Sequence, residues 1–348
     1  VCVLDMADGS VVYNRTEDKP SNHWTVGQEA VQTLLHSLLR EALKEIGADS
    51  FVTVGFSLSG MDNKSEQTTF IEGFSALTPT LADNIRVFND TVGSAFTASP
   101  EGGAILIAGT GSIGRVMCRV PSTETEGEGE GETLLDRRVG GWGHMLGDEG
   151  SAYSIASNTI REAFNQADGL VPGRDSLGEI VRGEGERMRE REALPDADYA
   201  LSCIYTHFGI KERRDILGPI YRTFDKATVA GLASLVAEGA KKRDPFCVRQ
   251  MSIAGRDLGR IAATLLPHIP TPPGQEGGWP RPVKTIVAVG SVWKSYQLFR
   301  GIFDAQIPCT SEYRLVRLSV PAACGAAWYA HLLCCGTELP RGDWVQAL

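Results

Sequence analysis

The segment Gly140 to Ala152, GGWGHMLGDEGSA, combines residue types that suit a ligand site. Five glycines, a tryptophan, a histidine and two adjacent carboxylates occur in thirteen residues, without the hydrophobic period of a buried helix or strand. Asp148 and Glu149 could accept hydrogen bonds from a ligand. They could equally be the N-terminal acids of a helix that begins near Gly150, where the helix dipole favours negative charge.

Asp90 is a second candidate for chemistry. The apolar run Ile85 to Asp90 predicts a strand that ends in this carboxylate, and a helix is expected over Thr91 to Ala98. A carboxylate at this place could cap the helix. Held at a strand tip in a cleft between domains, it could also act as a general base toward an alcohol.

Two glycine–serine turns follow buried strands, at residues 108–112 (AGTGS) and 289–295 (VGSVWKS). Their backbone N–H groups and hydroxyls suit phosphate oxygens, because no bulky side chain blocks the approach. Either turn alone could be a tight structural turn. The presence of two in one chain favours a nucleotide site.

The elements that would position these residues are predicted as follows. The Asp-Gly turn in residues 1–15 predicts a hairpin, and the apolar period of residues 28–46 predicts a helix. A strand is expected over residues 51–60 and a hairpin over residues 102–117. Mostly helical structure is expected over residues 150–240, and a further helix over residues 251–269. A strand followed by a helix is expected over residues 283–295 and again over residues 314–335. Polar strand tips are where α/β proteins commonly bind ligands.

Composition limits the classes of function. The chain has 348 residues, a net charge of −9 and scattered basic residues, which disfavours a nucleic-acid or anionic-membrane partner. No signal peptide or long apolar run is evident. The eight cysteines lack CxxC or metal-finger spacing, so they are interpreted as reduced thiols of a cytoplasmic protein. A small-molecule partner is expected.

The motifs in combination are more specific than any one alone. SNHW (21–24), SLSG (57–60), NDTVGS (89–94), AGTGS, GGWGHMLGDEGSA and VGSVWKS occur in the order found in eukaryotic N-acetylglucosamine kinases. The chain resembles that family nearly from end to end. The resemblance implies a two-domain, ribonuclease H-like α/β fold of the actin/hexokinase-like ATPases, with an active-site cleft between the domains.

The resemblance also implies roles for individual residues. Asp90 would be the base at the sugar 6-hydroxyl, ATP with Mg²⁺ would be the phosphoryl donor, and no protein metal site is implied. The expected sugar-binding residues are Asn22, Ser59, Asp90, Ser112, Gly141, Trp142 and Asp148. The expected ATP-binding residues are Thr110, Ala230 and Ser291.

The expected N-terminal domain covers residues 1–100 and is completed by residues 330–348. The C-terminal domain covers residues 101–329, with a solvated acidic insertion at 121–136. Relatives suggest a homodimer.

One departure from the family separates two hypotheses. Family members begin with a strand that carries a glycine-rich phosphate-binding turn, and the sequence given starts beyond that point. The main hypothesis is a kinase that converts N-acetylglucosamine to its 6-phosphate in amino-sugar salvage. The alternative is a catalytically impaired sugar-binding or scaffold protein. A radical-dehydratase activator shares the fold but needs cluster-binding cysteines, whose local pattern is not found here.

Overall fold

The computed structural model describes residues 1–17, 26–121, 132–170, 195–270, 283–308 and 313–348. Its strands are β1 (Cys2–Leu4), β2 (Val11–Asn14), β3 (Phe51–Leu58), β4 (Ala82–Asn89), β5 (Gly102–Ala108), β6 (Ser112–Pro121), β7 (Glu132–Gly140), β8 (Lys284–Val289), β9 (Tyr313–Leu318) and β10 (Val345–Ala347). Its α-helices are α2 (Gln28–Ile46), α3 (Lys64–Ser75), α4 (Asp90–Ala98), α5 (Ala152–Ala167), α6 (Asp198–Phe208), α7 (Lys226–Lys241), α8 (Pro245–Leu265), α9 (Arg300–Asp304) and α10 (Ala322–Cys335). Within these ranges, no helix has the length and apolar character needed to cross a membrane.

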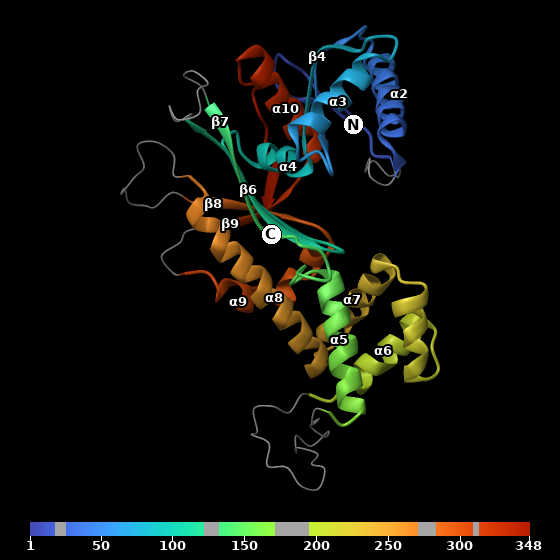
Figure 1. Ribbon diagram of the computed structural model, residues 1–348. Coiled ribbons are helices and arrows are strands. Elements are labelled where there is room, and N and C mark those ends of the chain that lie inside the picture. The colour runs from blue at the N-terminus through green and yellow to red at the C-terminus, as the bar shows by residue number, and fades with distance from the viewer. Residues whose placement is uncertain (18–25, 122–131, 171–194, 271–282, 309–312) are drawn as a thin grey trace.

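A six-stranded mixed sheet in the order β10-β9-β8-β5-β6-β7 lies at the middle of the molecule (Figure 1). Strands β9, β8 and β5 run parallel, whereas β6, β7 and β10 pair antiparallel with their neighbours. Successive side chains of a strand face opposite sides of a sheet. Accordingly, Leu106 of β5 packs in one core and Ile105 in another, and both are fully buried. The centre of the sheet is thus covered on both faces.

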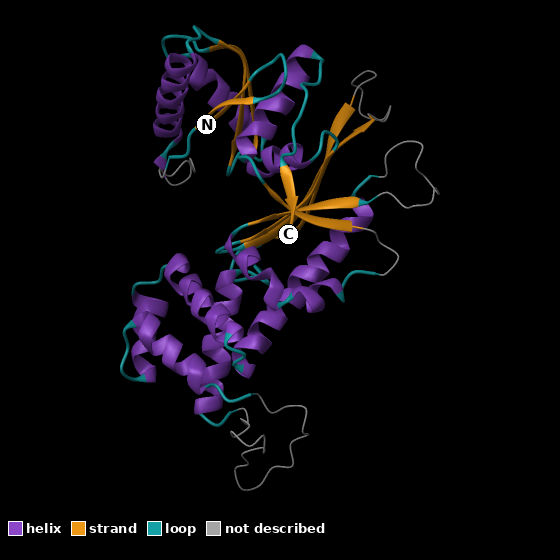
Figure 2. Cartoon of the chain, turned by 180° about the vertical axis from the view of Figure 1, so that it is seen from behind, coloured by secondary structure: helices purple, strands orange, loops and turns teal. Residues whose placement is uncertain are grey.

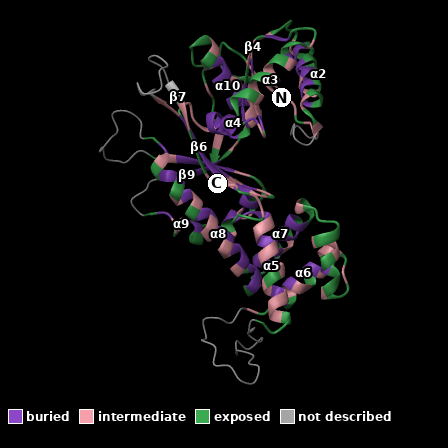
Figure 3. Cartoon of the chain, viewed as in Figure 1, coloured by how far each residue is buried: buried purple, intermediate pink, exposed green. Residues whose placement is uncertain are grey.

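Different helices cover the two faces. Helices α5, α7 and α8 contribute to the core that contains Leu106, whereas α4 and α10 contribute to the core that contains Ile105. Figures 1 and 2 show these two groups on opposite sides of the sheet, and Figure 3 shows that both groups contain buried residues. The sheet therefore separates the layer of α5, α7 and α8 from the layer of α4 and α10, which lies on the side of the N-terminal strands.

The N-terminal part contains the parallel pair β3 and β4, the antiparallel hairpin of β1 and β2, and helices α2 and α3. Its core includes Phe56, Phe70 and Phe74, whose rings make edge contacts or stack. Helix α10 packs against β3 and α4. The α4 contact is close: a Cβ at Gly325 would lie only 2.2 Å from the Gly93 carbonyl oxygen.

The predicted mixture of strands and helices is confirmed, including the Asp-Gly hairpin and the helix over 28–46. Two boundaries were wrong. The helix expected from 251 begins at Pro245, after an Asp244 side chain that accepts from the Cys247 N–H. The acidic insertion expected over 121–136 includes both ends of an antiparallel ladder, because β6 runs to Pro121 and β7 starts at Glu132.

Residues 330–348 divide between the two parts of the molecule. Helix α10, to which residues 330–335 belong, packs against β3 and β1 of the N-terminal part. Strand β10 instead pairs with β9 in the six-stranded sheet. The last helix and last strand therefore connect the two parts.

The interpretation of all cysteines as reduced thiols was wrong. Cys2 in β1 and Cys324 in α10 form a disulfide, although 322 residues separate them in sequence. Among the described residues, Cys118, Cys203, Cys247, Cys334 and Cys335 are free, and Cys309 lies outside the described ranges. Sequence spacing could not indicate this pair, because only packing of α10 on the N-terminal strands brings the two sulfurs together.

Candidate active site

The two glycine–serine turns lie against each other. The first connects β5 to β6, and the second connects β8 to the 3₁₀ helix η6 (Ser291–Leu298). Gly290 has φ 109°, and a Cβ there would lie 2.4 Å from the Ala108 carbonyl oxygen. Only glycine permits this backbone approach. Because β5 and β8 are parallel neighbours, both turns lie at the carboxyl ends of these two strands.

Asp148 lies beside the first turn. Its side chain is 5% exposed, and its Oδ1 accepts from the Ser112 N–H at 3.3 Å. The Ser112 hydroxyl donates to the Glu149 carbonyl, which fixes the segment GGWGHMLGDEGSA against the start of β6. Asp148 has φ 64°, an uncommon conformation for a non-glycine residue. The packing therefore holds this carboxylate in one orientation.

Lys226 is the residue that sequence reasoning missed. Its Nζ lies 2.7 Å from Asp148 Oδ2, and a Cβ at Gly111 would lie 3.1 Å from the same Nζ. Lys226 begins α7, directly after Asp225, whose side chain caps the helix. The Asp-Lys pair at a helix start was the available signal, but it did not indicate a partner 78 residues away. A cation thus lies at the turn expected to bind phosphates.

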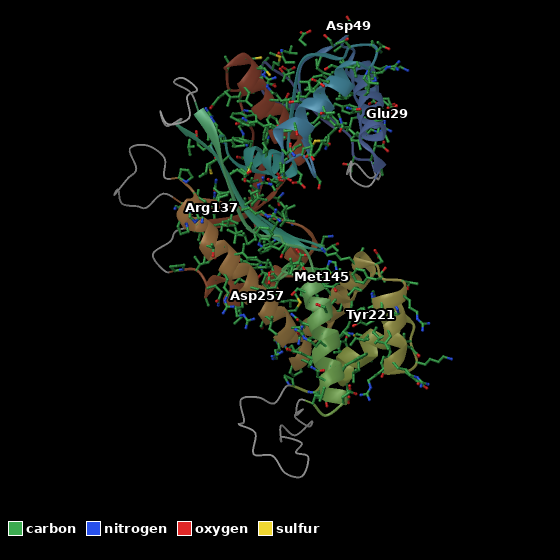
Figure 4. All side chains as sticks on the ribbon, viewed as in Figure 1. Glu29, Asp49, Arg137, Met145, Tyr221 and Asp257 are labelled. Atoms are coloured by element: carbon green, nitrogen blue, oxygen red, sulfur yellow. A yellow bond between two sulfur atoms is a disulfide. The ribbon has the colours of Figure 1, made fainter. Side chains whose placement is uncertain are left out.

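The loop that follows β7 extends from the sheet toward the start of α5. Trp142 is 66% exposed, and the Arg138 guanidinium lies 4.7 Å from its ring centroid. Arg138 also donates to the carbonyls of Gly140 and Gly141. Figure 4 shows Met145 of the same loop near the start of α5. The indole is therefore accessible to a ligand.

Asp90 is the first residue of α4, where Asn89 is the N-cap and accepts from the Thr91 N–H. Asp90 is accessible to solvent but lines a cavity. Desolvation by the surrounding protein raises the pKa of its carboxyl, as does nearby Asp62, whereas Arg115 lowers it. A carboxylate with a raised pKa beside a cavity suits a general base.

The cavity that Asp90 lines is a groove between β1 and β3, with a volume of about 610 Å³. Residues 1–6 form one side, residues 50–58 form the other, and Ala322, Ala323 and Ala327 of α10 also line it. Within the described sheets, β3 pairs only with β4, and β1 only with β2. The strand edges that face this groove therefore carry backbone groups without a neighbouring strand.

The remaining predicted residues are placed as follows. Ser59 is exposed in the turn after β3, and Thr110 and Ser291 are exposed at the two glycine–serine turns. Ala230 is buried in the first turns of α7, in the core that also holds Ala108 and Val292. Asn22 lies outside the described residues. The structure thus brings Thr110, Ala230 and Ser291 to neighbouring elements, while Ser59 and Asp90 follow β3 and β4 of the N-terminal part.

Among the described residues, no group of three histidines, cysteines or carboxylates could hold a metal ion. Asp148 is already paired with Lys226, and Asp62 with Arg115. Mg²⁺ commonly takes one or two carboxylates together with substrate phosphates and water. The donor set therefore fits a metal that arrives with a nucleotide better than one held by the protein alone.

The sheet and its two helical layers have the arrangement of the actin/hexokinase-like fold. A structure from Porphyromonas gingivalis, described as a candidate N-acetylglucosamine kinase, matches 95% of this chain and 94% of its own with a TM-score of 0.58 at 18% identity. A glucokinase of the ROK family from Streptomyces griseus, solved with glucose and AMPPNP, matches 95% of each chain with a TM-score of 0.50 at 14% identity. These similarities establish the fold.

The profile of the BadF/BadG/BcrA/BcrD ATPase family matches residues 1–330. The chain belongs to this family. It is also 27% identical over 244 residues to the N-acetylmuramic acid/N-acetylglucosamine kinase of Clostridium acetobutylicum, covering 69% of this chain and 67% of that protein. The N-acetyl-D-glucosamine kinase of Dictyostelium discoideum is 24% identical over 185 residues, which is 50% of this chain and 53% of the relative.

Proposed function

We propose that this protein is an ATP-dependent kinase that converts N-acetylglucosamine to N-acetylglucosamine 6-phosphate. The sugar 6-oxygen forms a bond to the γ-phosphorus, the bond to the bridging oxygen of ADP breaks, and Asp90 takes the hydroxyl proton. The relatives named as kinases of this sugar support the substrate. The proposal depends mainly on one observation: both glycine turns, Asp148 and Lys226 lie close together at the carboxyl ends of β5 and β8.

On the sugar side, Asp148 accepts hydrogen bonds from ring hydroxyls, and Gly141 and Trp142 form a backbone and aromatic surface beside it. Ser112 orients Asp148 through its N–H. Asn22 and Ser59 complete this set by family resemblance. A site that pairs a buried acceptor with a substrate hydroxyl strongly rejects analogues without that hydroxyl.

On the nucleotide side, Thr110 and Ser291 contact ATP from the two turns, and Ala230 contacts it from α7. Mg²⁺ that arrives with ATP would supply positive charge to offset the negative charge of the transferring group. Because phosphoryl transfer depends mainly on positioning and charge stabilisation, the turns and Lys226 contribute by holding the phosphates. Amino-sugar salvage, a cytoplasmic location and a homodimer are further parts of this proposal, supported by family resemblance.

The second candidate is a protein that binds the sugar but transfers no phosphate. The groove between β1 and β3 favours it, because unpaired strand edges beside Asp90 leave part of the site's surroundings incomplete. In this case the surfaces around Asp148 and Trp142 still bind the amino sugar, while the phosphates of ATP are poorly held.

Calorimetry and a product assay on the 348-residue chain separate the candidates. For the kinase, N-acetylglucosamine and ATP with Mg²⁺ each bind, and mass spectrometry detects the sugar 6-phosphate. Sugar binding without ATP binding or product supports the second candidate. Absence of sugar binding contradicts both. Titration with N-acetylmannosamine and N-acetylmuramic acid establishes which acyl sugar is preferred.

A further inference from the structure

A cluster of charged residues near Asp90 joins the two parts of the molecule. Arg115 of β6 donates through Nη1 to Asp62 Oδ1 at 2.8 Å, and through Nε to Asp136 Oδ1 at 2.6 Å. Its Nη2 donates to the second oxygen of Asp136. Asp62 follows β3 in the N-terminal part, whereas Asp136 belongs to β7 of the six-stranded sheet. One guanidinium therefore connects both parts.

The connection continues to the helix that carries Asp90. The Asn89 side-chain amide donates to the same Asp62 oxygen at 2.6 Å, and the Asn89 side-chain oxygen caps α4 by accepting from the Thr91 N–H at 2.9 Å. Asp62 thus accepts from both Arg115 and Asn89. The chain of contacts runs from β7 through Arg115 to the residue immediately before Asp90.

The exposed fractions of the three charged side chains indicate which one has the most restricted position. The Arg115 side chain is 11% exposed, whereas those of Asp62 and Asp136 are 56% and 40% exposed. A buried guanidinium with a bidentate carboxylate partner has a restricted orientation. Arg115 is therefore the fixed member, and Asp62 and the loop after β3 are held against it.

We propose that Arg115 is a positioning residue for phosphoryl transfer, which holds Asp62 and the first turn of α4 and places one positive charge beside Asp90. The inference rests on the proposed kinase function, in which Asp90 is the base. Arg115 touches neither reactant in this account. It acts by fixing where Asp90 lies and how readily Asp90 stays ionised.

The charges around Asp90 predict opposite effects for two substitutions. Arg115 lowers the pKa of Asp90, whereas Asp62 raises it. Asp5 and His331 line the same cavity and are unchanged in either variant. Arg115→Met removes the positive charge, so Asp90 holds its proton to higher pH. Asp62→Asn removes the negative charge, so Asp90 ionises at lower pH. Both variants break the same ion pair.

The test is the pH dependence of kcat for the wild type, Arg115→Met and Asp62→Asn. We expect the acid limb to move to higher pH in Arg115→Met and to lower pH in Asp62→Asn. At pH 7, kcat of Arg115→Met should fall about 10- to 100-fold with little change in KM for the sugar, because misplacement of a catalytic group mainly affects turnover. Arg115→Lys should restore the limb toward the wild-type position.

Arg119→Met is the matched control. Arg119 lies on the same strand, its side chain is 13% exposed, and it pairs with Glu338 at 2.8 Å. This variant should leave the acid limb unshifted. If Arg115→Met and Asp62→Asn lose kcat equally and neither shifts the acid limb of the pH profile, the ion pair has a purely structural role. That result would overturn the inference.

A second readout separates this inference from the kinase proposal. The Asp90 carboxyl carbon can be titrated by carbon-13 NMR, with its signal assigned by its loss in Asp90→Asn. Opposite shifts in the two variants, together with no sugar phosphate from the wild type, would retain the charge effect and reject the kinase function. Unchanged titration in Arg115→Met would reject the inference, whether or not the wild type is active.

Discussion

At the scale of single residues, Asp90 shows how the surrounding protein shifts the pKa of a carboxyl group. Its pKa is raised first by desolvation and then by Asp62. A carboxyl whose pKa is higher in the folded than in the unfolded state adds stability only at low pH, and this contribution is lost as pH rises through the folded-state pKa. At neutral pH the surroundings of Asp90 therefore disfavour its ionised form.

Asp90→Asn should therefore separate turnover from stability. We expect kcat to fall about 10²- to 10⁴-fold, because the base is lost, while calorimetric sugar affinity stays near that of the wild type. The thermal midpoint at pH 7 should be unchanged or higher, because no charge is desolvated. Asp83→Asn, an exposed position in the same strand region, is the control and should change neither quantity. Near-normal turnover in Asp90→Asn would remove Asp90 from the base role.

At the scale of elements, the parallel pairing of β5 with β8 brings two separate turns to one place. The close approach of Gly290 to Ala108 leaves no room for a side chain, and φ 109° with ψ 170° belongs to a region that only glycine occupies readily. The residue type at position 290 thus determines how closely the turns that carry Thr110 and Ser291 can approach each other.

Gly290→Ala should separate the turns and strain the backbone. We expect the free energy of unfolding to fall by about 1–3 kcal/mol, and KM for ATP to rise more than KM for the sugar. Urea denaturation and steady-state kinetics measure the two effects. Gly301→Ala is the matched control, since its Cβ would meet nothing within 4 Å and it lies in α9. That variant should be neutral or slightly stabilising; equal KM changes for both substrates in Gly290→Ala would contradict an ATP-side role.

At the scale of the whole molecule, the two ends of the chain are held together. The disulfide joins β1 to α10, and β10 pairs with β9 in the six-stranded sheet. The C-terminal segment consequently contacts both the N-terminal strands and the six-stranded sheet. Changes in this segment should affect the stability of the complete fold.

Cys324→Ser tests this long-range connection. Removing a native disulfide typically costs about 2–5 kcal/mol, so the variant should unfold at lower urea concentration than the oxidised wild type. Reduction of the wild type should produce a similar loss. Cys335→Ser removes an exposed free thiol and should leave the midpoint unchanged. A wild-type midpoint that does not respond to reductant would show that the two cysteines are not linked in solution.

Local features of this protein could be predicted from the sequence because they depend on residues within a few positions of one another. The Asp-Gly hairpin, the helix over 28–46 and the strand that leads to Asp90 are of this kind. The motif order also indicated the family, which the match over residues 1–330 establishes. The roles of Asp90, Asp148 and the ATP-binding residues remain predictions.

Only the tertiary structure decided which distant residues meet. Lys226 pairs with Asp148 across 78 residues, Arg115 with Asp62 across 53, and Cys2 with Cys324 across 322. Each pair depends on how strands are ordered in a sheet and how helices pack on it, and local spacing carries no record of that order. These charged groups and sulfur atoms lie close together only in the folded protein, because folding places the helices and strands that carry them side by side.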